Sequence, residues 1–191
     1  MILSALCIVG LAFSAAPLAD TAACIPHVIH GNQIVGHGAR TCQGEYVGRV
    51  TDIIIAPQEN RISHVLISDV QLRLVVVPWE AVTVRLDDGI IVNATLDRLG
   101  QGPFLSFDDW GNLSDPQWQA HVRTSFGLSP YADPAVAMSG CDSLNVKLGD
   151  VMRMDVTASG LRRVGGVFDI IAEPCGRILY AAVLVNEVCD P

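Results

Sequence analysis

A segment of β character occurs twice in this chain of 191 residues. Residues 47–57 read VGRVTDIIIAP, and residues 164–174, which lie 117 positions later, read VGGVFDIIAEP, so seven of the eleven letters agree. Side chains of a strand alternate between two faces, and the identities concentrate on one face. Because packing in an interior restricts substitution, the pattern predicts two copies of one β-structure with a similar interior. The recurring residues are Gly48, Val50, Asp52 and Ile54, with their counterparts Gly165, Val167, Asp169 and Ile171.

Short β-rich segments surround the first occurrence. Turn-forming residues separate them, such as Pro57 to Asn60 and Asp87-Asp88-Gly89. Many short strands at close spacing predict an all-β fold, either a small barrel or a sandwich. The expected strands cover residues 46–56, 62–68, 72–77, 81–86 and 90–94.

One helix is expected over residues 114–127, with Ser114 as its cap and Pro116 in its first turn. Its apolar residues Trp118, Val122 and Phe126 fall on one stripe. That stripe should pack against the β-structure. Residues 128–139 are expected to be a linker.

The second copy is shorter than the first. With one residue deleted in the turn at residues 174–177, it contains counterparts of one hairpin only, with strands at 164–172 and 178–185. An isolated hairpin is marginal in water, and open apolar edges recruit further strands. The second copy should therefore complete its sheet against the first copy, against a second molecule or against another protein. Docking onto the first copy of the same chain is the favoured arrangement.

The charge and the N-terminal segment bear on partners and location. The net charge of −8 disfavours nucleic acid and anionic membrane surfaces. Residues 1–23 resemble a secretory signal peptide with small residues near a cleavage site, so the chain should be exported to the periplasm or the extracellular space. Membrane attachment would require that this segment is retained as a span or that Cys24 is lipidated.

Removal of the signal leaves five cysteines, and an oxidising compartment favours their pairing. Cys141 opens the second copy and Cys189 nearly closes the chain, so we expect these two to pair. Cys24 with Cys42 is the second candidate pair. Cys175 would then be the free or intermolecular thiol.

The candidates for chemistry each have a structural alternative. His27, His30 and His37 lie close in sequence to Cys24 and Cys42 and could bind zinc or copper, but glycine-rich segments often carry histidine without a metal. The recurring aspartates at 52 and 169 could be poised acids or bases, or could accept backbone hydrogen bonds at a turn. We favour the structural alternative for both groups. We expect no enzyme, because no nucleophile motif is present, and we expect no metal site and no cofactor.

The stretch GEYVGRVTDIIIAPQENRISHVLIS, followed by VVVPWEAVTV, resembles the PRC-barrel family, which is named for the H subunit of the photosynthetic reaction centre. The resemblance covers residues 44–127. It implies a compact, strongly bent β-barrel that serves as a scaffold or docking module and brings no catalytic residues. The residues that carry it are Gly44, Glu45, Gly48, Val50, Asp52 and Ile53, with Val77-Pro78-Trp79.

The sequence thus divides into a signal peptide (1–23), an irregular lead-in (24–43), a PRC-barrel-like domain (44–127), a linker (128–139) and a partial second copy (140–191). The expected function is that of a non-catalytic, exported binding or assembly module whose partner is another protein or a second copy of the chain. Two alternatives remain open, a metal-binding envelope protein and a membrane-tethered subunit of a larger, photosynthetic-type complex.

Overall fold

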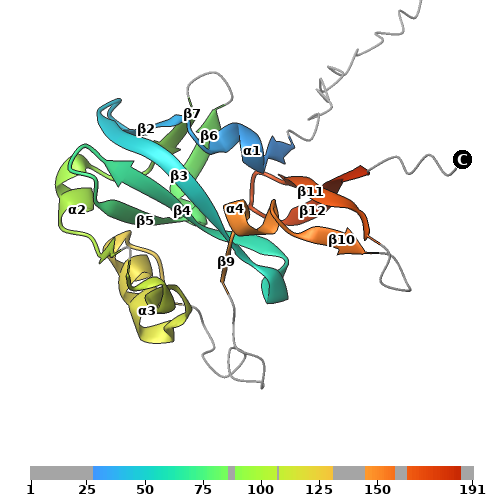
Figure 1. Cartoon of the computed structure of the whole chain (residues 1–191). Coiled ribbons are helices and arrows are strands. Elements are labelled where there is room, and N and C mark those ends of the chain that lie inside the picture. The colour runs from blue at the N-terminus through green and yellow to red at the C-terminus, as the bar shows by residue number, and fades with distance from the viewer. Residues whose placement is uncertain (1–27, 86–88, 107, 131–144, 158–162, 186–191) are drawn as a thin grey trace, which may run out of the picture.

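The computed structural model describes residues 28–85, 89–106, 108–130, 145–157 and 163–185. The predicted signal peptide, His27, and the cysteines at 24, 141 and 189 lie outside these ranges. The described part is mainly β, as predicted, and consists of two sheets that lie side by side (Figure 1). No described helix has the length and apolar character that crossing a membrane requires.

The first sheet has the strand order β6-β7-β2-β3-β4-β5-β8, and β9 (Val146–Lys147) also pairs with β3. Neighbours are antiparallel except β2 and β7, which are parallel. Within the described residues the hydrogen-bonded ladder does not close on itself, so the barrel is open between β6 and β8. The strands are β2 (Gly38–Thr41), β3 (Tyr46–Ala56), β4 (Arg61–Asp69), β5 (Leu74–Pro78), β6 (Val82–Arg85), β7 (Gly89–Val92) and β8 (Phe104–Leu105).

The strands β3 to β7 follow the sequence predictions closely, because turn chemistry fixes their ends. The turn between β3 and β4 consists of the 3-10 helix η1 (Pro57–Glu59) and Asn60, which adopts a left-handed conformation with φ of 51°. Apolar residues fill both faces of the central strands. One buried cluster includes Val50, Val65 and Val77 inside the curved sheet.

A second cluster, on the other face of the sheet, includes Ile54, Leu66 and Val76. The helix α3 (Pro116–Ser125) covers this face, and Val122 is buried there, as the predicted stripe requires. The cap is Asp115 rather than Ser114, because its carboxylate accepts a hydrogen bond of 2.8 Å from the amide of Gln117. The structure also contains shorter helices, whose sequences show little hydrophobic periodicity. They are α1 (Gly31–Ile34), α2 (Leu96–Gly100), α4 (Leu148–Val151), η2 (Trp79–Ala81) and η3 (Trp110–Ser114).

The described part of the predicted irregular lead-in is in fact regular. It contains β1 (Ile29–His30), α1 and β2, and β2 lies between β3 and β7 within the first sheet. The glycines at 31, 36 and 38 suggested an irregular segment, but they lie in and around these elements. Strands of two and four residues and a one-turn helix are too short to produce a hydrophobic period that sequence reading could detect.

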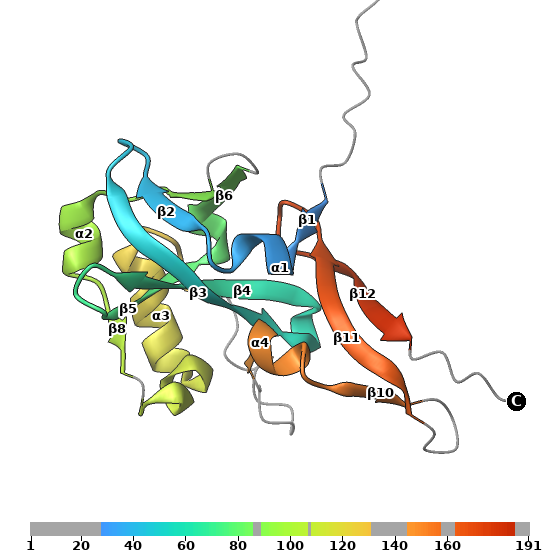
Figure 2. The same cartoon turned by 45° about the horizontal axis from the view of Figure 1, so that its top comes forward.

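The second sheet is built around β11 (Arg163–Ala172). On one edge β11 pairs with β12 (Ile178–Val185), and on the other edge it pairs with β10 (Asp155–Thr157) and β1. Figures 1 and 2 show α1 and α4 between the two sheets, where the sheets meet. The strands β11 and β12 coincide with the two strands predicted for the second copy.

The hairpins β3–β4 and β11–β12 have the same register. Gly48 pairs with Asp69, and Gly165 pairs with Val185, one residue closer in sequence because of the shorter turn. Irregularities follow Val50 and Ile54 in β3 and follow Val167 and Ile171 in β11. At Gly48 and Gly165 a Cβ atom would clash with the carbonyl group of Ser68 or Leu184, which explains why both glycines recur.

Candidate interaction surface

The two sheets exchange short strands where they meet. The strand β1 precedes the first sheet in the chain but pairs with β11 of the second sheet, with His30 opposite Ile171. Conversely, β9 precedes the second sheet but pairs with β3 of the first sheet, with Lys147 opposite Ile54. Each sheet therefore receives a strand from the segment that leads into the other one. The hairpin of residues 163–185 is thus docked within the same chain, as the sequence favoured.

The recurring aspartates hold these exchanged segments. The carboxylate of Asp52 on β3 accepts hydrogen bonds from the amides of Ile53 at 2.9 Å and of Gly149 in α4 at 3.1 Å. The carboxylate of Asp169 on β11 accepts them from Ile170 at 2.8 Å and from Asn32 in α1 at 3.0 Å. In each case the distant donor is the second amide of a one-turn helix, a position that lacks an intrahelical acceptor.

Both aspartates thus accept backbone hydrogen bonds, as the structural alternative expects, with one difference in the donors. The sequence placed the hydrogen bonds within the local turn, whereas the structure adds a donor from the exchanged segment. No local pattern could show this, because Asp52 and Gly149 are far apart in the chain.

The predicted metal-binding histidines have separate surroundings. His30 Nδ1 lies 2.8 Å from Oδ2 of Asp169, which is buried. His37 lines a shallow pocket with Gln33, Val84 and Arg85. In the described part of the chain no three His, Cys, Asp or Glu side chains converge as a metal site would require.

The described cysteines are both free and exposed. Cys175, which the sequence left without a partner, lies in the turn between β11 and β12. Cys42 is also free, whereas the sequence paired it with Cys24, a residue outside the described ranges. The predicted pair of Cys141 and Cys189 lies outside them as well.

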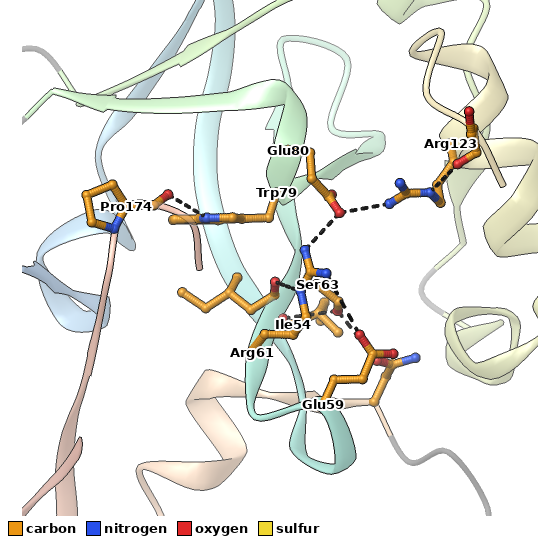
Figure 3. A network of polar contacts seen from close by, with 11 residues as sticks. Ile54, Glu59, Arg61, Ser63, Trp79, Glu80, Arg123 and Pro174 are labelled. Carbon is orange, nitrogen blue, oxygen red and sulfur yellow. Dashed lines mark hydrogen bonds and ion pairs between the residues drawn. The ribbon is translucent and has the colours of Figure 1, made fainter. Parts of the chain in front are cut away.

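Backbone hydrogen bonds join the turn of the β3–β4 hairpin to the turn of the β11–β12 hairpin. The amide of Ile62 donates to the carbonyl of Gly176 at 2.8 Å, and the amide of Ile178 donates to the carbonyl of Asn60 at 2.9 Å. The indole Nε1 of Trp79 donates to the carbonyl of Pro174 at 3.0 Å (Figure 3). The buried tryptophan of the first sheet thus anchors the turn of the second hairpin.

An ion-pair network lies beside this joint. Glu80 Oε1 accepts from Arg61 Nη2 at 2.8 Å and from Arg123 Nη1 at 3.0 Å, which links β4, η2 and α3 (Figure 3). Burial alone would raise the pKa of Glu80, but a backbone amide and the two guanidinium groups outweigh it and hold the pKa below its ordinary value. Glu80 and the two arginines thus connect α3 to the first sheet.

His64 lies in β4 near this network and is fully buried. Neither of its ring nitrogens has a hydrogen-bond partner. Burial lowers its pKa to about 4, against an opposing effect from Glu80 and with further lowering by Arg123 and Arg61. His64 is therefore neutral at pH 7. Sequence reading missed it, because nothing in the local pattern separates it from its buried neighbours.

The second sheet carries an exposed apolar surface, which we call the β12 surface. The exposed fractions are 56% for Phe168, 67% for Tyr180 and 64% for Leu184. On the other face of β12, Val183 and Val185 are exposed as well. Among the described strands β12 pairs with β11 alone, so beyond Ile178, which bonds Asn60, its outer edge is open. Monomeric proteins rarely leave such a patch beside an open strand edge, and the combination is typical of an interaction site.

Comparison with protein families supports the predicted resemblance. Residues 26–99 match the family model of the PRC-barrel domain, so this part of the chain carries a PRC-barrel domain. The match begins before the predicted start at residue 44 and includes β1, α1 and β2. No curated protein matches the chain.

Proposed function

We propose that this protein is a non-catalytic, exported binding or assembly module that engages a protein partner through the β12 surface. The PRC-barrel domain supports the general class of a binding or assembly module. The observation that carries the specific proposal is the position of three large apolar side chains, Phe168, Tyr180 and Leu184, beside an open strand edge. Backbone groups of an open edge supply affinity for an added strand, and neighbouring side chains supply specificity.

The residues with potential for chemistry support a structural role. Asp52 and Asp169 are occupied by backbone amides, and His30 is paired with Asp169. The described cations Arg61 and Arg123 converge on Glu80 rather than on a cleft. Because these side chains take part in structural contacts, a binding module is favoured over an enzyme and over the metal-binding alternative.

A photo-crosslinking amino acid can test the proposed surface in cells. We expect p-benzoylphenylalanine at position 180 to form adducts with a protein partner in the native host. The matched control is position 72, because Leu72 is equally exposed but lies in the turn after β4 of the first sheet. Adducts at 180 and none at 72 are the expected result. Equal yields at both positions, or no adduct at 180, would contradict the proposal.

A further inference from the structure

We infer that the strand that covers the β12 edge is β12 of a second copy of this chain, so that the protein assembles as a symmetric dimer. The inference rests on the proposed function, since it identifies the partner of the same surface.

The first sheet shows which kind of strand the β12 edge requires. The counterpart of β12 is β4, and β5 covers the outer edge of β4 in antiparallel orientation, with Val65 opposite Val77 and Ile67 opposite Val75. All five residues of β5 are buried. The missing partner of β12 should therefore be an antiparallel strand of about the same length, apolar on both faces and without charge.

The strand β12 itself meets these requirements. It reads ILYAAVLV from Ile178 to Val185, so it contains no charged residue and no proline, the usual protection of an exposed edge. Antiparallel pairing of two identical strands is self-complementary and forms a closed pair with two-fold symmetry.

The side chains of β12 suggest where the two-fold axis lies. With Ala182 on the axis, Tyr180 of one copy faces Leu184 of the second copy, and the reverse pair forms on the other side. Small residues then meet at the centre, and an aromatic–aliphatic pair covers each flank. Both exposed side chains with the largest apolar area on this face would be covered in the same step.

Local charge permits this contact despite the net charge of −8. Arg177, directly before β12, pairs with Glu173 at 2.5 Å, and Arg163 at the start of β11 pairs with Asp155 at 2.7 Å. The charged groups described next to the hairpin are thus neutralised within one copy. Uncompensated repulsion between the two hairpins is small at this contact.

Sedimentation velocity of the mature chain, from about 1 to 100 μM, tests the inference. The wild type should be a dimer, and the double variant Tyr180→Lys/Leu184→Lys should be a monomer with an unchanged circular dichroism spectrum. The matched control Val70→Lys/Leu72→Lys places the same charges on exposed apolar residues of the turn between β4 and β5 and should remain dimeric. Hydrogen exchange should protect β12 amides in the dimer and not in the monomeric variant.

If the double variant unfolds, Ala182→Cys provides a second test. A disulfide between the introduced thiols of the two copies, identified by peptide mapping, is expected, and Val70→Cys should form none. A monomeric wild type would overturn the inference, even if its β12 amides were protected. A double variant that stays dimeric would overturn it as well. A monomeric wild type that still forms adducts at position 180 with a different protein overturns only the self-pairing, whereas the absence of any adduct overturns the proposed function as well.

Discussion

The hairpins β3–β4 and β11–β12 share a register and differ in what covers them. In the first sheet, β5 covers the edge of β4, and α3 covers the face that carries Leu66 and Val76. In the second sheet the register places Ala182 where Leu66 lies and Tyr180 where His64 lies, and Tyr180 is exposed. The comparison teaches that the same backbone pattern is buried where described strands and a helix cover it, and that it leaves large apolar side chains exposed where they do not.

The glycines at 48 and 165 should give the largest difference between the hairpins. A Cβ atom at either position would clash with the carbonyl of the opposite strand. Gly48→Ala should lower the free energy of unfolding by about 3 kcal/mol, because the clash lies between two central strands of the first sheet. Gly165→Ala should destabilise the second hairpin and leave the first sheet folded, although Gly165 is buried as well. Urea unfolding followed by tryptophan fluorescence measures the difference, and equal losses for the two variants would contradict the comparison.

The buried His64 of the first hairpin should make the stability of the protein depend on pH. The pKa of His64 is lowered to about 4 in the folded protein, whereas the unfolded value is about 6.5, so the unfolded state binds more protons between these values. Stability should therefore fall by about 3 kcal/mol as the pH falls from 6.5 to 4. Below that window the loss continues, since the pKa values of Glu80 and Asp69 are also lowered.

Removal of the buried imidazole should abolish the first part of this pH dependence. Denaturant unfolding of His64→Leu at several pH values between 4 and 6.5 measures it, and His121→Leu, on the exposed side of α3, is the matched control. A pH dependence in His64→Leu that equals that of the wild type would show that another group is responsible.

The two aspartates should differ by a smaller amount. Asp169 is buried and binds His30 as well as two amides, whereas Asp52 is partly exposed and accepts from two amides. Asp169→Ala should cost about 2 kcal/mol and Asp52→Ala about 1 kcal/mol, because unpaired donors cost more when they are buried. Thermal unfolding of the two variants compares them, and the reverse order would contradict the roles given to the aspartates.

The strands and their turns could be predicted from the sequence, whereas their pairing across the chain could not. Residues such as Asn60 and the alternation in residues 46–56 specify β3 and β4 locally. The exchanged strands β1 and β9 have two residues each, and their partners depend on tertiary packing rather than on any local pattern. Residues 29–41 were expected to be irregular because the partners of their strands, too, depend on tertiary packing and not on a local pattern.

The sequence predicted an open edge in the second hairpin, but it could not predict which of the hairpin's two edges stays open after docking. Docking covers the edge of β11 through β1 and joins the turns through Gly176 and Asn60. It leaves the rest of β12 without a second strand among the described residues, because the first hairpin reaches β12 only at Ile178. Only the three-dimensional arrangement shows which of the two edges stays available.

The dependence of the second hairpin on the first sheet is tested most directly with the isolated fragment of residues 140–191. This fragment lacks β1, α1 and Trp79, which hold β11 and the turn at Pro174 in the intact chain. Circular dichroism of the dilute monomeric fragment during heating should show no cooperative transition, whether it is reduced or oxidised, while residues 24–139 should still unfold cooperatively at a lower temperature than the intact chain. A cooperative transition of the monomeric fragment would show that the second hairpin holds its own fold, and it would contradict the account.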